Sequence, residues 1–121
     1  MNVIKIGING HFYQVELAVS SEQRRLGLMH RSELVDDRGM LLVYARGGDH
    51  RIWMKNMRIP LRVYWIDADY RVIGKRRVEP CGANPCPVYG VAEASQYILE
   101  LNDTDHAIGI GDRVDGLSSL P

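Results

Sequence analysis

The chain has little of several things, and each shortage excludes a class of protein. Fifteen Lys and Arg balance fifteen Asp and Glu, so the formal net charge is zero. Non-specific binding to nucleic acids or anionic membranes needs an excess of positive charge, and we expect neither. The longest apolar runs, such as the one from Met40 to Ala45, fall far short of the roughly 20 residues of a membrane span.

The beginning of the chain also lacks the pattern of a secretory signal, because no apolar stretch and no small-residue cleavage site follow Met1. This predicts a cytoplasmic protein. No repeat, linker or low-complexity segment divides the 121 residues. We therefore expect one compact domain over residues 1–121, which is an ordinary domain size.

Cysteine is scarce as well: Cys81 and Cys86 are the two that occur. Two cysteines make no disulfide framework, so the core must supply most of the stability. They share a proline-rich loop and leave three readings open: a disulfide worth roughly 2 kcal/mol, two free thiols, or a metal or redox pair. No histidine lies near them in sequence, and their spacing is not that of a thioredoxin-like pair, so we favour the disulfide and predict no metal.

What the sequence does contain is alternation of apolar and polar residues. At the start of the chain this predicts a hairpin, with Asn9 and Gly10 as its type I′ turn. A two-residue loop pairs Ile6 with Tyr13 and places both apolar sets on one face. Next, Ser20 and Gln23 have the spacing of a helix capping box.

Further short strands are predicted at intervals of about ten residues, with a junction at Pro60. In the segment from Gln96 to Leu101, Tyr97, Leu99 and Leu101 share one face, so Glu100 points to the other if the segment is a strand; a helix starting at Val91 fits nearly as well. The fold class expected is α+β and β-rich: a mostly antiparallel sandwich or partly closed small barrel with one or two short helices.

Catalytic signatures are missing. There is no Gly-x-Ser-x-Gly, no phosphate-binding loop and no dinucleotide fingerprint, and we predict no cofactor. The strongest candidate site is polar. If the predicted helix packs beside the Trp-Met-Lys-Asn strand, hydrogen-bond donors converge beside an aromatic wall and would bind a carboxylate or a phosphate. The residues of this candidate ligand-binding site are Arg25, Arg31, Trp53, Lys55 and Asn56. The alternative is that each is a solvated surface residue.

Several motifs occur in an order that resembles one family. They include Gly27-Leu28-Met29-His30-Arg31, Trp53-Met54-Lys55-Asn56 and Ile59-Pro60-Leu61, followed by the two cysteines and Gly111-Asp112-Arg113-Val114. Together they resemble the domain of unknown function 192 family, over nearly the whole chain. The resemblance implies a compact, mostly β domain and no established activity. Many relatives look exported, which suits a bridge between Cys81 and Cys86. The family usually has an acidic residue where this chain has Arg62, which weakens any acid–base role at that position.

Three functions follow from these observations. The one we favour is a non-enzymatic or accessory binding domain, with a pocket for a small anionic or polar ligand or a peptide. The second is a small hydrolase in which Asp67 or Glu100 acts beside Lys55 or Arg31. The third is a protein-interaction module that uses a strand edge or an apolar patch. The partner expected is therefore a small molecule or a protein.

Overall fold

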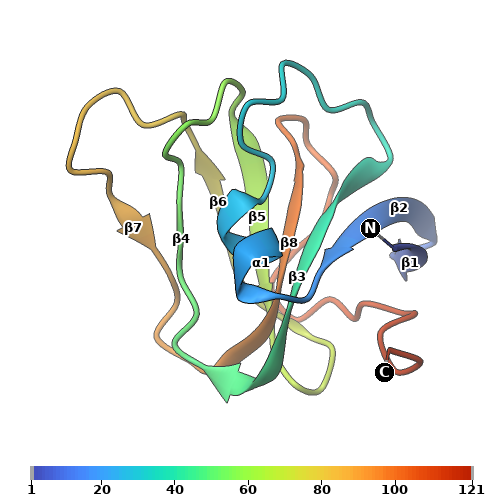
Figure 1. Ribbon diagram of the computed structural model, residues 1–121. Helices are drawn as coiled ribbons and strands as arrows, with labels where there is room; N and C mark the ends of the chain where they lie inside the picture. Colours follow the sequence, from blue (N-terminus) through green and yellow to red (C-terminus); the bar gives the residue numbers. More distant parts are fainter. Residues whose placement is uncertain (1, 121) are drawn as a thin grey trace.

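The computed structural model describes residues 2–120, which form eight strands and one helix. A six-stranded sheet has the order β1-β2-β3-β8-β5-β6, and a separate two-stranded ribbon pairs β4 with β7 (Figure 1). The strands are β1 (Val3–Ile8), β2 (His11–Ala18), β3 (Arg38–Gly48), β4 (Ile52–Trp53), β5 (Leu61–Ile66), β6 (Val72–Val78), β7 (Val88–Tyr89) and β8 (Ser95–Asn102). The helix, α1, spans Ser21–Leu26.

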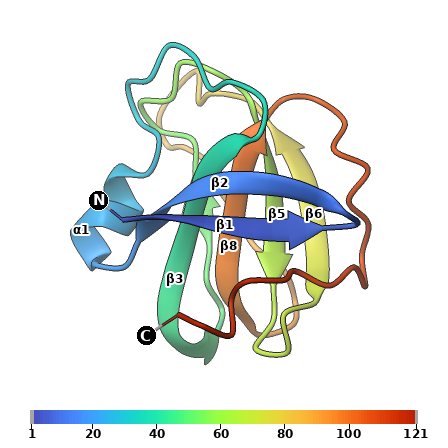
Figure 2. The ribbon, with the colours of Figure 1, turned by 90° about the vertical axis from the view of Figure 1, so that its right-hand side faces the viewer.

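The expected fold class is confirmed: the chain is β-rich, its sheets are mostly antiparallel, and it contains one short helix. Within the main sheet β2 and β3 are the parallel pair, since α1 and a long loop carry the chain back between them. The edge strands β1 and β6 do not pair with each other, so the sheet stays open. Instead, the β1–β2 hairpin crosses in front of β8, β5 and β6, as Figure 2 shows.

Local sequence signals produce the first two elements. Asn9 and Gly10 both adopt positive φ, as a type I′ turn requires, and Ile6 pairs with Tyr13 as predicted. The side chain of Ser20 accepts a hydrogen bond from the Gln23 backbone, and the Gln23 side chain accepts one from the Ser20 backbone. This reciprocal capping box starts α1 where the sequence indicates.

Strands β3, β8 and β5 have two buried faces because each face is covered by other parts of the chain. Leu41, Leu99 and Ile66 face the core under the β1–β2 hairpin and the C-terminal segment. Met40 and Ile98 face a second core under α1, the loop after it and the β4–β7 ribbon. We call these the hairpin face and the helix face. Residues that are neighbours along a strand therefore belong to different cores.

Two segments differ from the sequence expectation. The strand expected at Trp53-Met54-Lys55-Asn56 is reduced to the short β4, because Asn56 adopts a φ of 59° and the chain turns after Trp53. The alternative helix that would start at Val91 is also wrong, since β8 pairs with β3 and β5 along its length. Pairing on both sides satisfies the backbone of β8, so the helix-forming residues before it do not decide the structure. In the part of the chain that the structure describes, no helix combines the length and hydrophobicity needed to cross a bilayer.

Candidate functional site

An open cavity of about 340 Å³ lies on the helix face, between α1 and the β4 segment. This volume is within the roughly 300–1,000 Å³ typical of small-molecule pockets. Most of its wall is apolar, and three of its residues are large hydrophobic side chains exposed at the surface: Leu26, Trp53 and Val88 are 52%, 39% and 56% exposed. We call this space the inner cavity. Exposed apolar side chains that gather in one place mark a binding surface more often than isolated ones do.

The inner cavity contains one carboxylate among the described residues that line it, that of Glu100. Glu100 is 6% exposed, and its neighbours on the adjacent strands are Met40 and Val63. Its carboxylate takes part in no ion pair formed within residues 2–120. Burial in these apolar surroundings raises the pKa of the Glu100 carboxyl to about 7.

The end of α1 lies directly over this carboxylate. Gly27 ends the helix with a φ of 49° and a ψ of −128°, and a β-carbon at this position would lie 3.6 Å from Oε1 of Glu100. Glycine is the residue that adopts this backbone conformation without strain. The early end of α1 therefore brings the chain close to the floor of the inner cavity, and the next residues, Leu28 and Met29, continue its wall.

Cationic and phenolic groups surround the same space. The guanidinium of Arg24 donates to the carbonyls of Val19 and Val43 and lies 4.6 Å from the centre of the Tyr44 ring. Burial, together with the nearby Glu100 carboxylate, raises the pKa of the Tyr44 hydroxyl. Arg51 also lines the cavity, and its side chain is held by Asp49.

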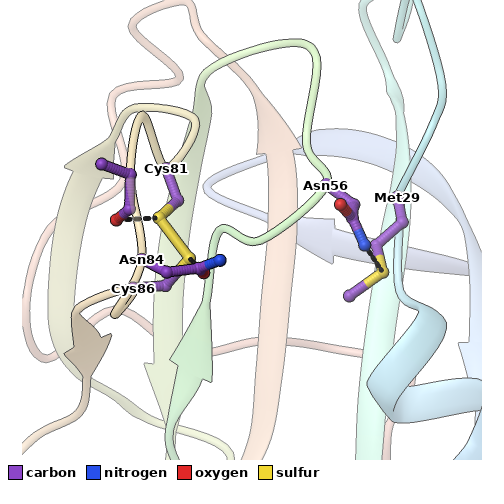
Figure 3. Close-up of a disulfide and its surroundings, with 6 residues drawn as sticks. Met29, Asn56, Cys81, Asn84 and Cys86 are labelled. Carbon is purple, nitrogen blue, oxygen red and sulfur yellow. Dashed lines mark hydrogen bonds between the residues drawn. A yellow bond between two sulfur atoms is a disulfide. The ribbon is translucent and has the colours of Figure 1, made fainter.

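A second hollow, of about 400 Å³, adjoins the inner cavity and shares Arg25, Leu26, Met29 and Trp53 with it. We call it the outer hollow. Its other residues are Glu22, Lys55 and Asn56. The Lys55 ammonium lies 5.1 Å from the centre of the Trp53 ring. The Asn56 amide lies 4.0 Å from the sulfur of Met29, and Figure 3 shows the two side chains facing each other.

The structure thus places four of the five site residues predicted from the sequence around one hollow: Arg25, Trp53, Lys55 and Asn56. The fifth, Arg31, lies elsewhere. Its guanidinium donates two hydrogen bonds to the Glu16 carboxylate, on β2, at 2.5 and 2.9 Å. This pairing lowers the pKa of Glu16. We therefore leave Arg31 out of the candidate site.

In Figure 3, the two cysteines and Asn56 lie on opposite sides of β4. Their Sγ atoms are bonded, with the α-carbons 5.7 Å apart. The backbone N–H of Cys81 donates to the carbonyl of Met54 at 3.1 Å, which ties the cysteine loop to the segment that carries the site. Across residues 2–120, no three or more His, Cys, Asp or Glu side chains gather closely enough to hold a metal ion.

The sequence did not predict the inner cavity. For Glu100 it predicted only that the side chain points to the face of the strand opposite Leu99. The signal was present: a lone glutamate in an otherwise apolar strand points to the side opposite Leu99. What the pattern did not reveal is that this other side is also buried, because the strands and the helix that cover it are distant in sequence. Arg24, Tyr44 and Arg51 carried no signal of their own.

The chain belongs to the domain of unknown function 192 family, described as “Uncharacterized ACR”, whose family profile matches residues 4–116. Two solved structures are similar to it. One, from Sinorhizobium meliloti 1021, is described as a “putative transcription regulator”; it is 29% identical, with a TM-score of 0.82 over 93% of this chain and 91% of that one. The other is a protein of unknown function from Novosphingobium aromaticivorans DSM 12444, 28% identical, with a TM-score of 0.82 over 94% of this chain and 85% of that one. No curated protein of known function matches.

Proposed function

We propose that this chain is a binding domain for a small ligand that has an anionic group and an apolar body. The anionic group is held at the outer hollow, and the apolar body lies against Trp53 and Leu26 and enters the inner cavity. The observation that carries the proposal is that Arg25 and Lys55, from segments far apart in the chain, line one hollow that opens directly onto an apolar cavity.

Arg25 and Lys55 are two cations of the outer hollow that are available to bind an anionic group. Among the ion pairs of residues 2–120, none includes Arg25 or Lys55. Glu22 is the carboxylate that lines the same hollow. The two cations outnumber it, so the hollow favours a negative group, and a guanidinium beside an ammonium suits a carboxylate or a phosphate.

Binding is better supported than hydrolysis. The hydrolase hypothesis requires Asp67 or Glu100 beside Lys55 or Arg31. The Asp67 carboxylate accepts hydrogen bonds from the backbone N–H groups of Asp69 and Arg71, which is the role of a turn residue. Neither Lys55 nor Arg31 lines the cavity of Glu100. We also propose that nucleic acid is not the partner, because the net charge of zero lacks the positive excess that such binding requires.

The test is calorimetric titration of the purified chain with inorganic phosphate, benzoate and hexanoate, supported by thermal denaturation. A ligand that binds the folded state raises the melting temperature. We expect benzoate and hexanoate to bind more tightly than phosphate, because they add an apolar body. Arg25→Gln and Lys55→Gln should each weaken binding by about five- to tenfold, as loss of a charge-assisted hydrogen bond does.

Arg38→Gln is the matched control, because Arg38 is an exposed arginine at the start of β3 that forms no ion pair within the described residues and lies outside both cavities. This variant should bind as the original chain does. An unchanged melting temperature with all three probes at millimolar concentration, or equal weakening by Arg38→Gln, would refute the proposal.

A further inference from the structure

Glu100 has no structural task that explains its position. A buried acidic side chain is ordinarily paired or hydrogen-bonded, because removing a charge from water is costly. Burial is the cause of the raised pKa of Glu100, with no hydrogen-bond partner from residues 2–120 contributing to it, and the side chains opposite Glu100 on β3 and β5 are Met40 and Val63. Among these residues the sealed polar atom without a partner is the Ser95 hydroxyl, so the oxygens of Glu100 face the open cavity.

The position of Glu100 in the inner cavity suits contact with a bound ligand. The carboxylate lies on the sheet that forms the floor of the inner cavity, under the end of α1, while Arg25 and Trp53 belong also to the outer hollow. The space therefore has a hydrogen-bond acceptor on its floor, while Arg24, Arg25 and Arg51 line it and Lys55 lies beyond them in the outer hollow. One acceptor among several cations selects both the chemistry and the direction of a bound molecule.

We propose that Glu100 is the inner subsite of this pocket and that it accepts a hydrogen bond from a donor group, most favourably an ammonium, at one end of a small molecule whose other end is anionic. The ligand class is thus a compact zwitterion with an apolar stem between its charges. This proposal rests on the proposed function, because the anionic end uses the outer hollow.

The charged and titratable groups around Glu100 agree with this orientation. Arg24 and Arg25 face the cavity from α1, Tyr44 from β3, and Arg51 from the segment before β4. Arg24 is engaged by two backbone carbonyls and Arg51 by Asp49, so neither neutralises Glu100 by an ion pair. Without another carboxylate among the described lining residues, Glu100 is the group of the inner cavity that attracts a cationic head.

The experiment compares hexanoate with its ω-amino derivative, measured by calorimetric titration at pH 8. Shorter and longer pairs, from butanoate to octanoate, find the stem length that fits. At the best length, the ω-amino acid should bind at least about tenfold more tightly than the plain acid, because it adds a charge-assisted hydrogen bond to the Glu100 carboxylate. Hexylamine, which lacks the anionic end, should bind more weakly than the ω-amino acid.

Variants separate this subsite from the anion site. In Glu100→Gln and Glu100→Met the preference for the ω-amino acid should disappear, while the plain acid still binds. In Arg25→Gln both acids should weaken by the same factor, and the preference should remain. Glu93→Gln is the control, because Glu93 is an exposed glutamate that lines neither cavity.

The dependence on pH gives a second signature. Because the pKa of Glu100 is about 7, the preference for the ω-amino acid should fall as the pH drops from 8 to 6 and a proton replaces the ammonium. Arginines do not titrate in this range, and the pKa of Tyr44 is raised above its ordinary value of 10.0. His50 stacks on Tyr44 at 3.6 Å between ring centres, so the series is repeated with His50→Phe.

The outcomes distinguish the two proposals. If plain acids bind but an ω-amino group gives no advantage at any length, or the advantage survives in Glu100→Met, the Glu100 subsite is refuted and the anion site stands. If no acid of either series binds, both proposals fail. An advantage that is lost in both Glu100 variants and kept in Arg25→Gln and Glu93→Gln supports the subsite.

Discussion

The two faces of the central strands differ in whether they contain a cavity and a charged side chain. On the hairpin face, the side chains of Leu99, Leu101 and Leu41 are fully buried in one hydrophobic cluster. On the helix face, the corresponding layer contains the carboxylate of Glu100 and opens through the inner cavity to solvent. The hairpin face is packed for stability, whereas the helix face combines a buried core with a cavity and an acid that forms no ion pair within residues 2–120. Proteins accept such a cost at binding sites, where preformed space and polar groups are required.

The largest effect should come from truncation on the hairpin face. Leu99→Ala removes a fully buried side chain from the closed core, and we expect the free energy of unfolding to fall by about 2–5 kcal/mol. Urea denaturation measures it. Val88→Ala, at the exposed mouth on the other side of the sheet, should cost under about 0.5 kcal/mol. Equal losses at the two positions would contradict the distinction between the faces.

The next effect has the opposite sign and depends on pH. Burial raises the pKa of Glu100 from 4.5 to about 7, so the folded protein holds this proton more tightly than the unfolded chain. The resulting stability is present below 4.5, the pKa in the unfolded chain, and is lost as the pH rises through about 7. Glu100→Gln has no carboxyl to ionise, so it should be more stable than the original chain by up to roughly 3 kcal/mol near pH 8 and nearly equal to it near pH 4.

Denaturation curves of both proteins across this pH range test that expectation. Glu93→Gln, the exposed control, should show no such divergence. A Glu100→Gln variant that is less stable than the original chain at pH 8 would mean that the carboxylate contributes to folding, and the contrast between the faces would lose its basis.

The smallest effect concerns Arg31, which pairs with Glu16 outside both cavities. The side chains are 38% and 29% exposed, so water screens the pair, and Arg31→Gln should cost under about 1 kcal/mol. The pairing lowers the pKa of Glu16; its stabilisation is therefore present above 4.5 and is lost as the pH falls through the lowered value. Titration with benzoate should give the same affinity for Arg31→Gln and the original chain. A weaker affinity would return Arg31 to the site.

Local signals predicted the parts of this fold whose causes lie within a few residues. The turn at Asn9-Gly10 set the register of the first hairpin, and the capping box of Ser20 and Gln23 set the start of α1. The length of β4 was overestimated, because the sequence from Trp53 to Asn56 has the pattern of a strand while the backbone turns at Asn56. That turn depends on packing between Asn56 and the loop after α1, where its carbonyl accepts from the N–H of His30.

The candidate site was predicted only in part, because its geometry depends on packing between distant segments. Arg25, Trp53, Lys55 and Asn56 were grouped on the assumption that the helix lies beside their segment, and they do line one hollow. Arg31, close to Arg25 in sequence, was grouped with them but pairs with Glu16, because the backbone turns at His30, whose φ is 68°, after Met29 has lined the cavity. Sequence distance alone does not tell which of two neighbouring arginines faces a pocket.

By itself, the sequence determined the alternation of strands, the first turn, the helix start and the fact that Glu100 points away from Leu99, because these follow from backbone geometry over a few residues. Only the tertiary structure decided that the far side of β8 is covered, and by what. Pairing of β8 with β3 and β5 and the return of α1 across them bring together groups from residues 24 to 100. Burial is a property of that assembly, and burial is what turns an ordinary glutamate into an unpaired acid at the base of a cavity.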